Sequence, residues 1–221
     1  MEFKEFMIIG CGRFGRSVAV TLAELGHEVL VIDKDEDTIN EISTSVTHAV
    51  SADVMIEGTL ESLGIHNMDE VIVAMGSNFE ASLMATAVAK ENNVKTVIAK
   101  VSDKIHGRIM KKVGADRVII PEKDSGIRLA YNISTSNILD YIEVSDDFSI
   151  MEVKPPKSWI GRSLAQLDIR NNYGVTVVAV KEEDVKEINI NPKPDYVFDQ
   201  SDIVLVLGKY KKIEAIVGEE S

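Results

Sequence analysis

Cysteine is nearly absent from this sequence. The 221 residues include only Cys11, so no disulfide can form within the chain. This fits a reducing compartment such as the cytoplasm, where structural disulfides are rare. Positive charge is also scarce, because 24 Lys and Arg against 36 Asp and Glu give a formal net charge of -12. An acidic surface repels phosphate backbones, so we expect no nucleic-acid partner.

Long apolar runs are missing too. No stretch approaches the roughly 18 to 20 apolar residues that a helix needs to cross a bilayer. The first residues, MEFKEF, are charged and lead directly into an apolar segment, so we expect no signal peptide. If the protein acts in membrane transport, it must therefore dock on another chain that spans the membrane.

The usual catalytic motifs are absent as well. The sequence contains no G-x-S-x-G, HExxH or CxxC. A dehydrogenase needs a proton donor or acceptor beside its nicotinamide, and Tyr131 does not begin a Tyr-x-x-x-Lys pair. We therefore expect that the protein is not an enzyme. The histidines also lack metal-ligand spacing: His27, His48, His66 and His106.

Strand and helix patterns alternate through the first two thirds of the chain. Short apolar segments are each followed by a helical segment, and short connections join them. Parallel strands need crossovers, which helices supply on both faces of a sheet. The pattern predicts an α/β fold with a doubly wound, parallel, six-stranded Rossmann sheet. The predicted strands are 6–10, 28–33, 48–53, 70–75, 96–101 and 117–121.

The pattern changes after residue 121. Periodic apolar residues predict one long amphipathic helix over 122–142, and this helix can pack either on its own sheet or on another surface. A polar connector follows at 145–148. The rest combines strands, a Pro-Pro break and short helices, as in a small α+β domain. We expect two domains, 1–142 and 143–221.

Residues 6–19, FMIIGCGRFGRSVA, carry a G-x-G-x-x-G motif between a predicted strand and a predicted helix. Gly10 permits the tight turn, Gly12 lets the backbone approach a diphosphate, and Gly15 lets helix and strand pack closely. The helix N-terminus presents free N–H groups to the phosphates. Asp33 ends the second strand, where a carboxylate binds ribose hydroxyls and repels a 2′-phosphate. The sequence predicts an adenine nucleotide other than NADP.

Residues near this motif each have two interpretations. Arg13 can meet a terminal phosphate or be a solvated surface arginine. Asp53 can accept the adenine amino group or cap a helix. Cys11 sits at a helix N-terminus, which can lower a thiol pKa, but without a nearby base we favour a packing role. Glu122 can face a phosphate-bound cation or precede a helix start capped by Asp124 or Ser125.

Several segments together resemble RCK domains, which regulate potassium conductance and include the KtrA and TrkA subunits of bacterial potassium uptake systems. These segments are GCGRFG, Asp33, SAD at 51–53, AMGSNFEAS at 74–82 and GADRVIIPEKDSG at 114–126. The tail, with WIGRSLAQLDIRNNYGVTVVAV, is similar to the family's RCK-C (TrkA-C) module. One departure is SAD, where many relatives have GDA or GNA.

The resemblance implies a regulatory subunit gated by ATP and ADP, with NAD or NADH as the alternative. It assigns Arg13 to the last phosphate, and Glu122 to Mg²⁺ or Ca²⁺ at a subunit interface. The implied nucleotide-site residues are Gly10, Cys11, Gly12, Arg13, Phe14, Gly15, Asp33, Lys34, Ala52, Asp53, Ala74, Met75, Gly76 and Lys100.

The resemblance also implies an assembly. Subunits pair through the 122–142 helix, and the pairs form a ring, expected to be an octamer. The ring lies in the cytoplasm against a KtrB- or TrkH-like membrane subunit. Some relatives bind a cyclic dinucleotide between paired tails, for which Arg170, Asn171 and Tyr173 are the candidates. The alternative for the tail is a plain dimerisation module.

Two other functions compete with this interpretation. A small NAD-dependent oxidoreductase would use the same glycine turn, and turnover of NADH with carbonyl substrates would identify it. A redox-sensing transcription factor needs a helix-turn-helix and a basic face, and the sequence contains neither.

Overall fold

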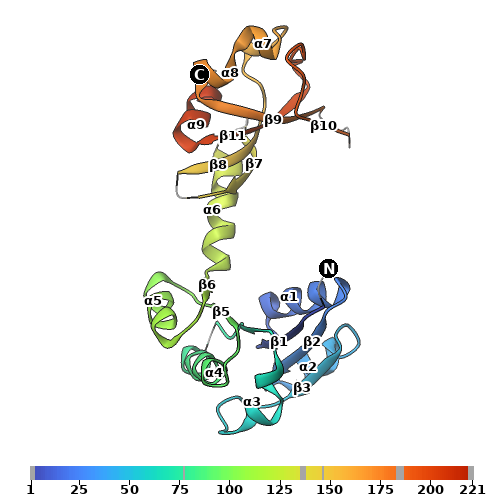
Figure 1. Cartoon of the computed structure of the whole chain (residues 1–221), viewed down its shortest axis with the longest axis vertical. Helices are drawn as coiled ribbons and strands as arrows, with labels where there is room; N and C mark the ends of the chain where they lie inside the picture. Colours follow the sequence, from blue (N-terminus) through green and yellow to red (C-terminus); the bar gives the residue numbers. More distant parts are fainter. Residues whose placement is uncertain (1–2, 77, 135–137, 146, 183–186, 219–221) are drawn as a thin grey trace. The chain divides into compact units, whose positions relative to one another are not determined.

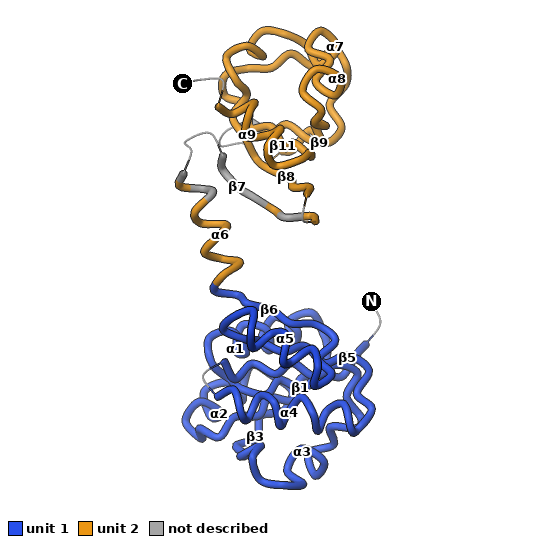
Figure 2. Tube along the Cα trace, turned by 90° about the vertical axis from the view of Figure 1, so that its left-hand side faces the viewer, with its two compact units in different colours: residues 1–122 blue, residues 123–221 orange. Residues whose placement is uncertain are grey.

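The computed structural model describes residues 3–76, 78–134, 138–145, 147–182 and 187–218. The chain divides into two compact units, Met1–Glu122 and Lys123–Ser221 (Figure 2). Each unit has its own sheet and its own apolar core.

The first unit is a parallel sheet in the order β3-β2-β1-β4-β5-β6. The order reverses at β1, which pairs with β2 on one side and β4 on the other, so the predicted doubly wound sheet is confirmed (Figure 1). The strands are β1 Glu5–Ile9, β2 Glu28–Asp33, β3 His48–Ser51, β4 Glu70–Val73, β5 Thr96–Lys100 and β6 Arg117–Ile119. The helices are α1 Arg13–Glu24, α2 Glu36–Ile42, α3 Thr59–Ser62, α4 Phe79–Glu91 and α5 Lys104–Val113, with a 3-10 turn, η1, at Ile65–Asn67.

Helices cover both faces of this sheet, which explains why β1 is apolar at consecutive positions. Phe6 and Ile8 pack into a cluster that includes Ala19 of α1 and Ile39 of α2. Met7 and Ile9 face the other way, into a cluster with the small residues of α4. Because successive strand residues point to opposite faces, a strand buried on both sides must be apolar throughout.

Short polar side chains fix where the helices begin. Asp35 accepts the Thr38 N–H at 2.7 Å and starts α2, and Asn78 accepts the Ala81 N–H at 3.1 Å and starts α4. Asp103 accepts the N–H groups of Ile105 and His106 at 2.7 and 2.9 Å and starts α5. Such caps satisfy N–H groups that have no partner within the helix.

The second unit contains an antiparallel sheet in the order β10-β9-β11-β8-β7. Trp159, Leu167 and Ile213 are buried in one core with the inner side chains of the sheet. The strands are β7 Ile138–Glu143, β8 Phe148–Val153, β9 Val175–Glu182, β10 Ile188–Ile190 and β11 Asp202–Lys209. The helices are α7 Leu164–Leu167, α8 Ile169–Tyr173 and α9 Tyr210–Gly218, with a 3-10 turn, η2, at Lys157–Trp159. The helix α6, Pro121–Ser134, begins at the end of the first unit and continues into the second.

The predicted helix over 122–142 is wrong in its second half. The helix α6 ends at Ser134, and 138–143 form β7, which pairs antiparallel with β8. Residues 135–137 lie outside the described residues. At the two ends of the polar connector, the Phe148 N–H donates to the Ser145 carbonyl at 3.2 Å. The apolar spacing in ILDYIE fits a helix and a strand equally, and pairing with β8 decides between them.

The contacts within the chain divide it after Glu122, whereas the sequence suggested a boundary after residue 142. The assignment of α6 to the nucleotide-binding domain stays a prediction. None of the helices in the described part of the chain combines the length and the apolar character that a membrane crossing needs.

Candidate functional site

A cavity of about 620 Å³ opens at the carboxyl ends of β1, β2, β4 and β5, in the first unit. Doubly wound sheets bind ligands there, where the strand order reverses. The volume lies within the range of small-molecule sites, about 300 to 1,000 Å³. The cavity is lined by Ile9, Gly10, Gly12, Ile32, Asp33, Lys34, Ala52, Asp53, Val54, Ala74, Met75, Gly76, Asn78, Ala81, Lys100, Ser102 and Glu122.

The glycine turn forms the floor of this cavity. Gly10 has φ +100°, and a Cβ atom there would lie 2.7 Å from Met75 Cγ, so a side chain is excluded by both conformation and space. Gly12 is different, because its φ is -67° and no described heavy atom outside its chain neighbours lies within 4 Å of a Cβ built there. Gly12 therefore leaves open space in front of the first turn of α1, where the motif places a diphosphate.

Asp33 is held in one orientation at the end of β2. Its Oδ2 accepts the backbone N–H of Cys11 at 2.6 Å, and its Oδ1 accepts the Asp35 N–H at 3.1 Å. The carboxylate lines the cavity. A fixed carboxylate can accept two ribose hydroxyls and repels a 2′-phosphate.

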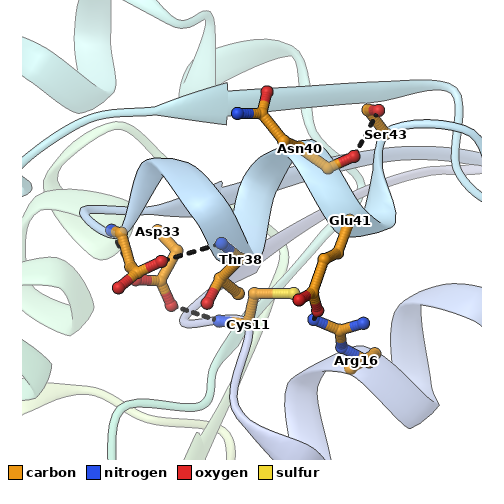
Figure 3. A network of polar contacts seen from close by, with 8 residues as sticks. Cys11, Arg16, Asp33, Thr38, Asn40, Glu41 and Ser43 are labelled. Atoms are coloured by element: carbon orange, nitrogen blue, oxygen red, sulfur yellow. Dashed lines mark hydrogen bonds and ion pairs between the residues drawn. The ribbon is translucent and has the colours of Figure 1, made fainter.

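Cys11 contributes its backbone to the site. The side chain is 2% exposed, and its sulfur points away from Asp33, toward Arg16 and Glu41 (Figure 3). Burial raises the pKa of the Cys11 thiol, although Arg16 opposes this effect. A buried, protonated thiol is unreactive, which favours the packing role.

Asp53 lies just after β3, which ends at Ser51, and lines the cavity next to Ala52. Its Oδ1 accepts the Met55 N–H at 2.9 Å within a turn, and the next helix, α3, begins only at Thr59. The alternative of a helix cap is therefore wrong. The contact with adenine stays a prediction.

Positive charge enters the cavity from β5. Lys100 is only 15% exposed, and its Nζ lies 2.7 Å from Oε1 of Glu122. The Lys100 ammonium, with smaller contributions from the Glu122 backbone N–H and the charge of Arg13, lowers the pKa of Glu122. Glu122, Asp124 and Ser125 all lie within α6, so the predicted capping of this helix by Asp124 or Ser125 is wrong.

The metal role of Glu122 stays a prediction. Among the described residues, no group of three or more His, Cys, Asp or Glu side chains could hold a metal ion. Glu122 pairs with Lys100 instead, while its own side chain is 66% exposed. Further oxygen ligands would have to come from a nucleotide, from water or from another subunit.

The structure gathers most of the predicted nucleotide-site residues around this cavity, but not all of them. Four of them do not line it: Cys11, Arg13, Phe14 and Gly15. Cys11 belongs to the glycine turn, and the other three form the start of α1. Sequence reasoning missed two groups of lining residues. The apolar ones are Ile9, Ile32, Val54 and Ala81, and the polar ones are Asn78 and Ser102. A signal for Asn78 and Ser102 was their position in the segments that follow β4 and β5, between each strand and the next helix.

The second unit contains a cavity of about 260 Å³ between α7, α8, β9 and the segment before β11. Arg170 lines it, as expected for a ligand residue. Asn171 instead donates to both Asp168 oxygens at 2.9 Å, and Tyr173 packs edge-on against Trp159 with ring centroids 5.4 Å apart. Of the three candidates, only Arg170 faces this cavity.

Comparison with known proteins identifies both units. The family model of the TrkA-N domain matches residues 6–121, and that of the TrkA-C domain matches residues 148–217. The chain is 41% identical to Ktr system potassium uptake protein C of Bacillus subtilis over 210 residues, covering 95% of this chain and 94% of that one. Ktr system potassium uptake protein A of Bacillus subtilis is 38% identical over 216 residues, covering 98% of this chain and 96% of that one.

A solved structure shares the fold at lower identity. The GsuK channel bound to NAD aligns with a TM-score of 0.54 at 19% identity, covering 98% of this chain and 38% of that longer chain. Family models and nearly full-length relatives thus agree with the doubly wound sheet and the small second unit. The chain therefore belongs to the RCK family of potassium uptake proteins, with a TrkA-N domain followed by a TrkA-C domain.

Proposed function

We propose that this chain is the cytoplasmic, nucleotide-binding regulatory subunit of a membrane potassium uptake system. The cavity with its fixed Asp33, in a chain that matches Ktr potassium uptake proteins along nearly its whole length, carries the proposal. The partner is a KtrB- or TrkH-like membrane subunit, against which copies of this chain form a ring of paired subunits, an octamer. The cavity binds a nucleotide as a regulatory ligand and catalyses no reaction on it.

The proposed ligands are ATP and ADP. Asp33 binds the ribose, the open space at Gly12 admits the diphosphate, and Lys100 supplies positive charge to the phosphates. Arg13 begins α1, and its charge helps to lower the pKa of the cavity residue Glu122, which supports its proposed role at the third phosphate. NAD, which the GsuK structure contains, or NADH is the alternative ligand for the same cavity.

Regulation follows from differential affinity. A nucleotide shifts a ring between two shapes only as far as it binds one shape more tightly. Each site typically supplies about 1–3 kcal/mol, and several coupled sites reach the roughly 5.5 kcal/mol that a full population exchange needs. In this mechanism ATP favours the activating ring and ADP the other one. Mg²⁺ or Ca²⁺ bound by Glu122 at a subunit interface would help to neutralise the third phosphate.

Calorimetric titration of the full chain with ATP, ADP, NADH and NADPH, with and without Mg²⁺, tests this proposal, together with the mass of the assembly in solution. We expect ring formation, binding of ATP and ADP, and rejection of NADPH. Arg13→Ala should remove the discrimination between ATP and ADP. Arg16→Ala is the matched control, because Arg16 pairs with Glu41 at 2.7 Å on the side of α1 that faces α2.

Two results would contradict the proposal. One is a monomer that shows no preference among nucleotides at millimolar concentration. The other is turnover of NADH with carbonyl substrates, which would identify the oxidoreductase alternative. If Arg13→Ala discriminates ATP from ADP as the wild type does, the assignment of Arg13 to the last phosphate is wrong.

A second ligand is proposed for the second unit. The cavity beside Arg170 offers a cation and, with Pro192 and Pro194, apolar walls to a cyclic dinucleotide shared between paired tails. Titration with cyclic di-AMP tests this, and Arg170→Ala should abolish the binding while Lys157→Ala leaves it intact. Absence of binding to the wild type would leave this unit as a plain dimerisation module.

A further inference from the structure

Lys100 connects three separate segments of the first unit. Its Nζ pairs with Glu122 at 2.7 Å and lies 5.8 Å from the centre of the Phe14 ring in α1. A Cβ atom on Gly76 would lie 3.3 Å from the same Nζ, so the side chain passes directly over the turn after β4. The ammonium group therefore stands where the glycine turn, the 74–76 turn and the first turn of α6 meet.

We propose that Lys100 exchanges its partner when a nucleotide binds: it releases Glu122 and pairs with a phosphate, so that occupancy of the cavity frees the start of α6. This inference rests on the proposed function, because it requires a nucleotide in the cavity. The inference adds to that function a route from the cavity to α6: Lys100 pairs either with the nucleotide or with Glu122 of the helix.

The different exposure of the two partners determines which of them leaves. Lys100 is 15% exposed, so its charge is largely removed from water and needs a counter-charge at all times. Glu122 is 66% exposed and regains full hydration as soon as it is released. Breaking the pair therefore costs Glu122 little, provided that a phosphate replaces it at Lys100.

Electrostatics favours the same exchange. Lys100 and Glu122 both line the cavity, so an arriving di- or triphosphate is attracted by the ammonium and repelled by the carboxylate. Either the carboxylate moves away, or a cation must be recruited between it and the phosphates.

Movement of Glu122 has consequences for α6. Pro121 begins this helix and Glu122 is its second residue, so the ion pair ties the first turn to β5. When the pair breaks, the covalent link through β6 remains, while the side-chain link is lost. The first turn of α6 should then open more often in the nucleotide-bound protein than in the empty one.

The test measures ADP and ATP affinity by calorimetry in EDTA, so that no divalent cation can use Glu122. The proteins are the wild type, Glu122→Gln, Lys100→Gln and the double variant. Glu122→Gln should tighten binding about tenfold, because Lys100 no longer has a charged competitor. Lys100→Gln should weaken binding. In the double variant the tightening should largely disappear, since there is no ammonium left to release.

Hydrogen exchange of the peptide covering 119–128 gives an independent readout. In the wild type, exchange there should rise when ADP or ATP binds. In Glu122→Gln it should already be raised without nucleotide and change little on binding. Lys100→Arg keeps the charge and should retain the nucleotide response. This variant separates the loss of the ammonium in Lys100→Gln from a loss of folding. Glu70→Gln is the matched control, because Glu70 also forms a 2.7 Å pair, with Lys4, at the amino ends of β1 and β4, which are the ends of the strands away from the cavity.

The outcomes separate this inference from the proposed function. If the wild type binds no adenine nucleotide, both fail. If it binds, and Glu122→Gln tightens binding equally with and without Lys100, the carboxylate only repels phosphate and the exchange does not occur. Unchanged or weaker binding by Glu122→Gln in EDTA, or lower exchange over 119–128 on nucleotide binding, would also overturn it.

Discussion

Gly15 and Gly10 are in direct backbone contact across the glycine turn. A Cβ atom on Gly15 would lie 1.9 Å from the carbonyl oxygen of Gly10 and 3.2 Å from Ala74 Cβ. The first turn of α1 therefore packs on the chain that leaves β1, without room for a methyl group. This contact gives the third glycine of the motif a structural reason that is independent of any ligand.

Gly15→Ala should destabilise the protein strongly. The added methyl group meets backbone rather than a flexible side chain, so α1 must move away from β1, which costs about 3 kcal/mol by analogy with overpacked cores. Urea unfolding measures the loss. The control is Gly126→Ala, because Gly126 lies in α6 with no described atom within 4 Å of an added Cβ outside that helix. That change should be neutral or slightly stabilising. A Gly15→Ala variant as stable as the wild type would show that the turn is looser than described.

Gly12→Ala should separate binding from folding. Gly12 has an ordinary φ of -67° and open space where the Cβ of an alanine would lie, so the empty protein tolerates this substitution. We expect a free energy of unfolding within about 0.5 kcal/mol of the wild type. Calorimetry should show ATP and ADP affinities at least about tenfold weaker, because the methyl group occupies the approach of the diphosphate. Undiminished affinity would move the phosphates to another part of the cavity.

Asp116 should contribute to the loss of stability in acid. Burial alone would raise the pKa of this carboxyl, but the Val97 N–H at 2.7 Å and the Lys90 ammonium at 3.0 Å outweigh it and lower the pKa. A carboxyl with a lowered pKa stabilises the fold above its ordinary pKa, about 4, and this contribution is lost as the pH falls through the folded value.

Asp116→Asn should therefore reduce the free energy of unfolding at pH 7 by about 1 kcal/mol, a modest figure because the side chain is 41% exposed. It should also flatten the dependence of the melting temperature on pH below about pH 5. Thermal melts from pH 7 to pH 3.5 measure both effects. Asp195→Asn, at an exposed position of the second unit, is the control. A difference from the wild type that is as large at pH 3.5 as at pH 7 would contradict this assignment.

Ser163 should stabilise the second unit through α7. Its Oγ accepts the Gln166 N–H at 3.2 Å, and Gln166 Oε1 accepts the Ser163 N–H at 2.9 Å, which is a reciprocal capping box. Ser163→Ala should cost about 1 kcal/mol, and Ser163→Thr, which keeps the hydroxyl, should cost less. Urea unfolding followed by Trp159 fluorescence reports on this unit, because the indole is buried in its core. Equal losses for alanine and threonine would rule out the cap as the cause.

Features set by local chain chemistry were predictable from the sequence. Gly10, Gly12 and Gly15 have fixed spacing, and Asp33 ends the next strand, so a parallel sheet necessarily brings them to one edge. Asn78 and Asp103 likewise predict where the helices that they cap begin. Each of these features depends on residues that are close in sequence or on the topology rule for parallel strands.

Features set by contacts between distant segments were not predictable in the same way. The strand β7 exists because β8 pairs with it, and nothing within 138–143 alone separates strand from helix. The pair of Lys100 and Glu122 depends on where β5 ends and where α6 begins. The sequence suggested both residues through the family resemblance, but not that they bind one another.

The burial of Cys11 has a practical consequence. It is the one thiol of the chain, and its side chain is 2% exposed behind the glycine turn. Maleimide dyes and spin labels should therefore not react with Cys11 in the folded protein. A cysteine introduced at an exposed position would then be labelled selectively. The rate at which Cys11 itself is slowly labelled would then report how often the glycine turn opens.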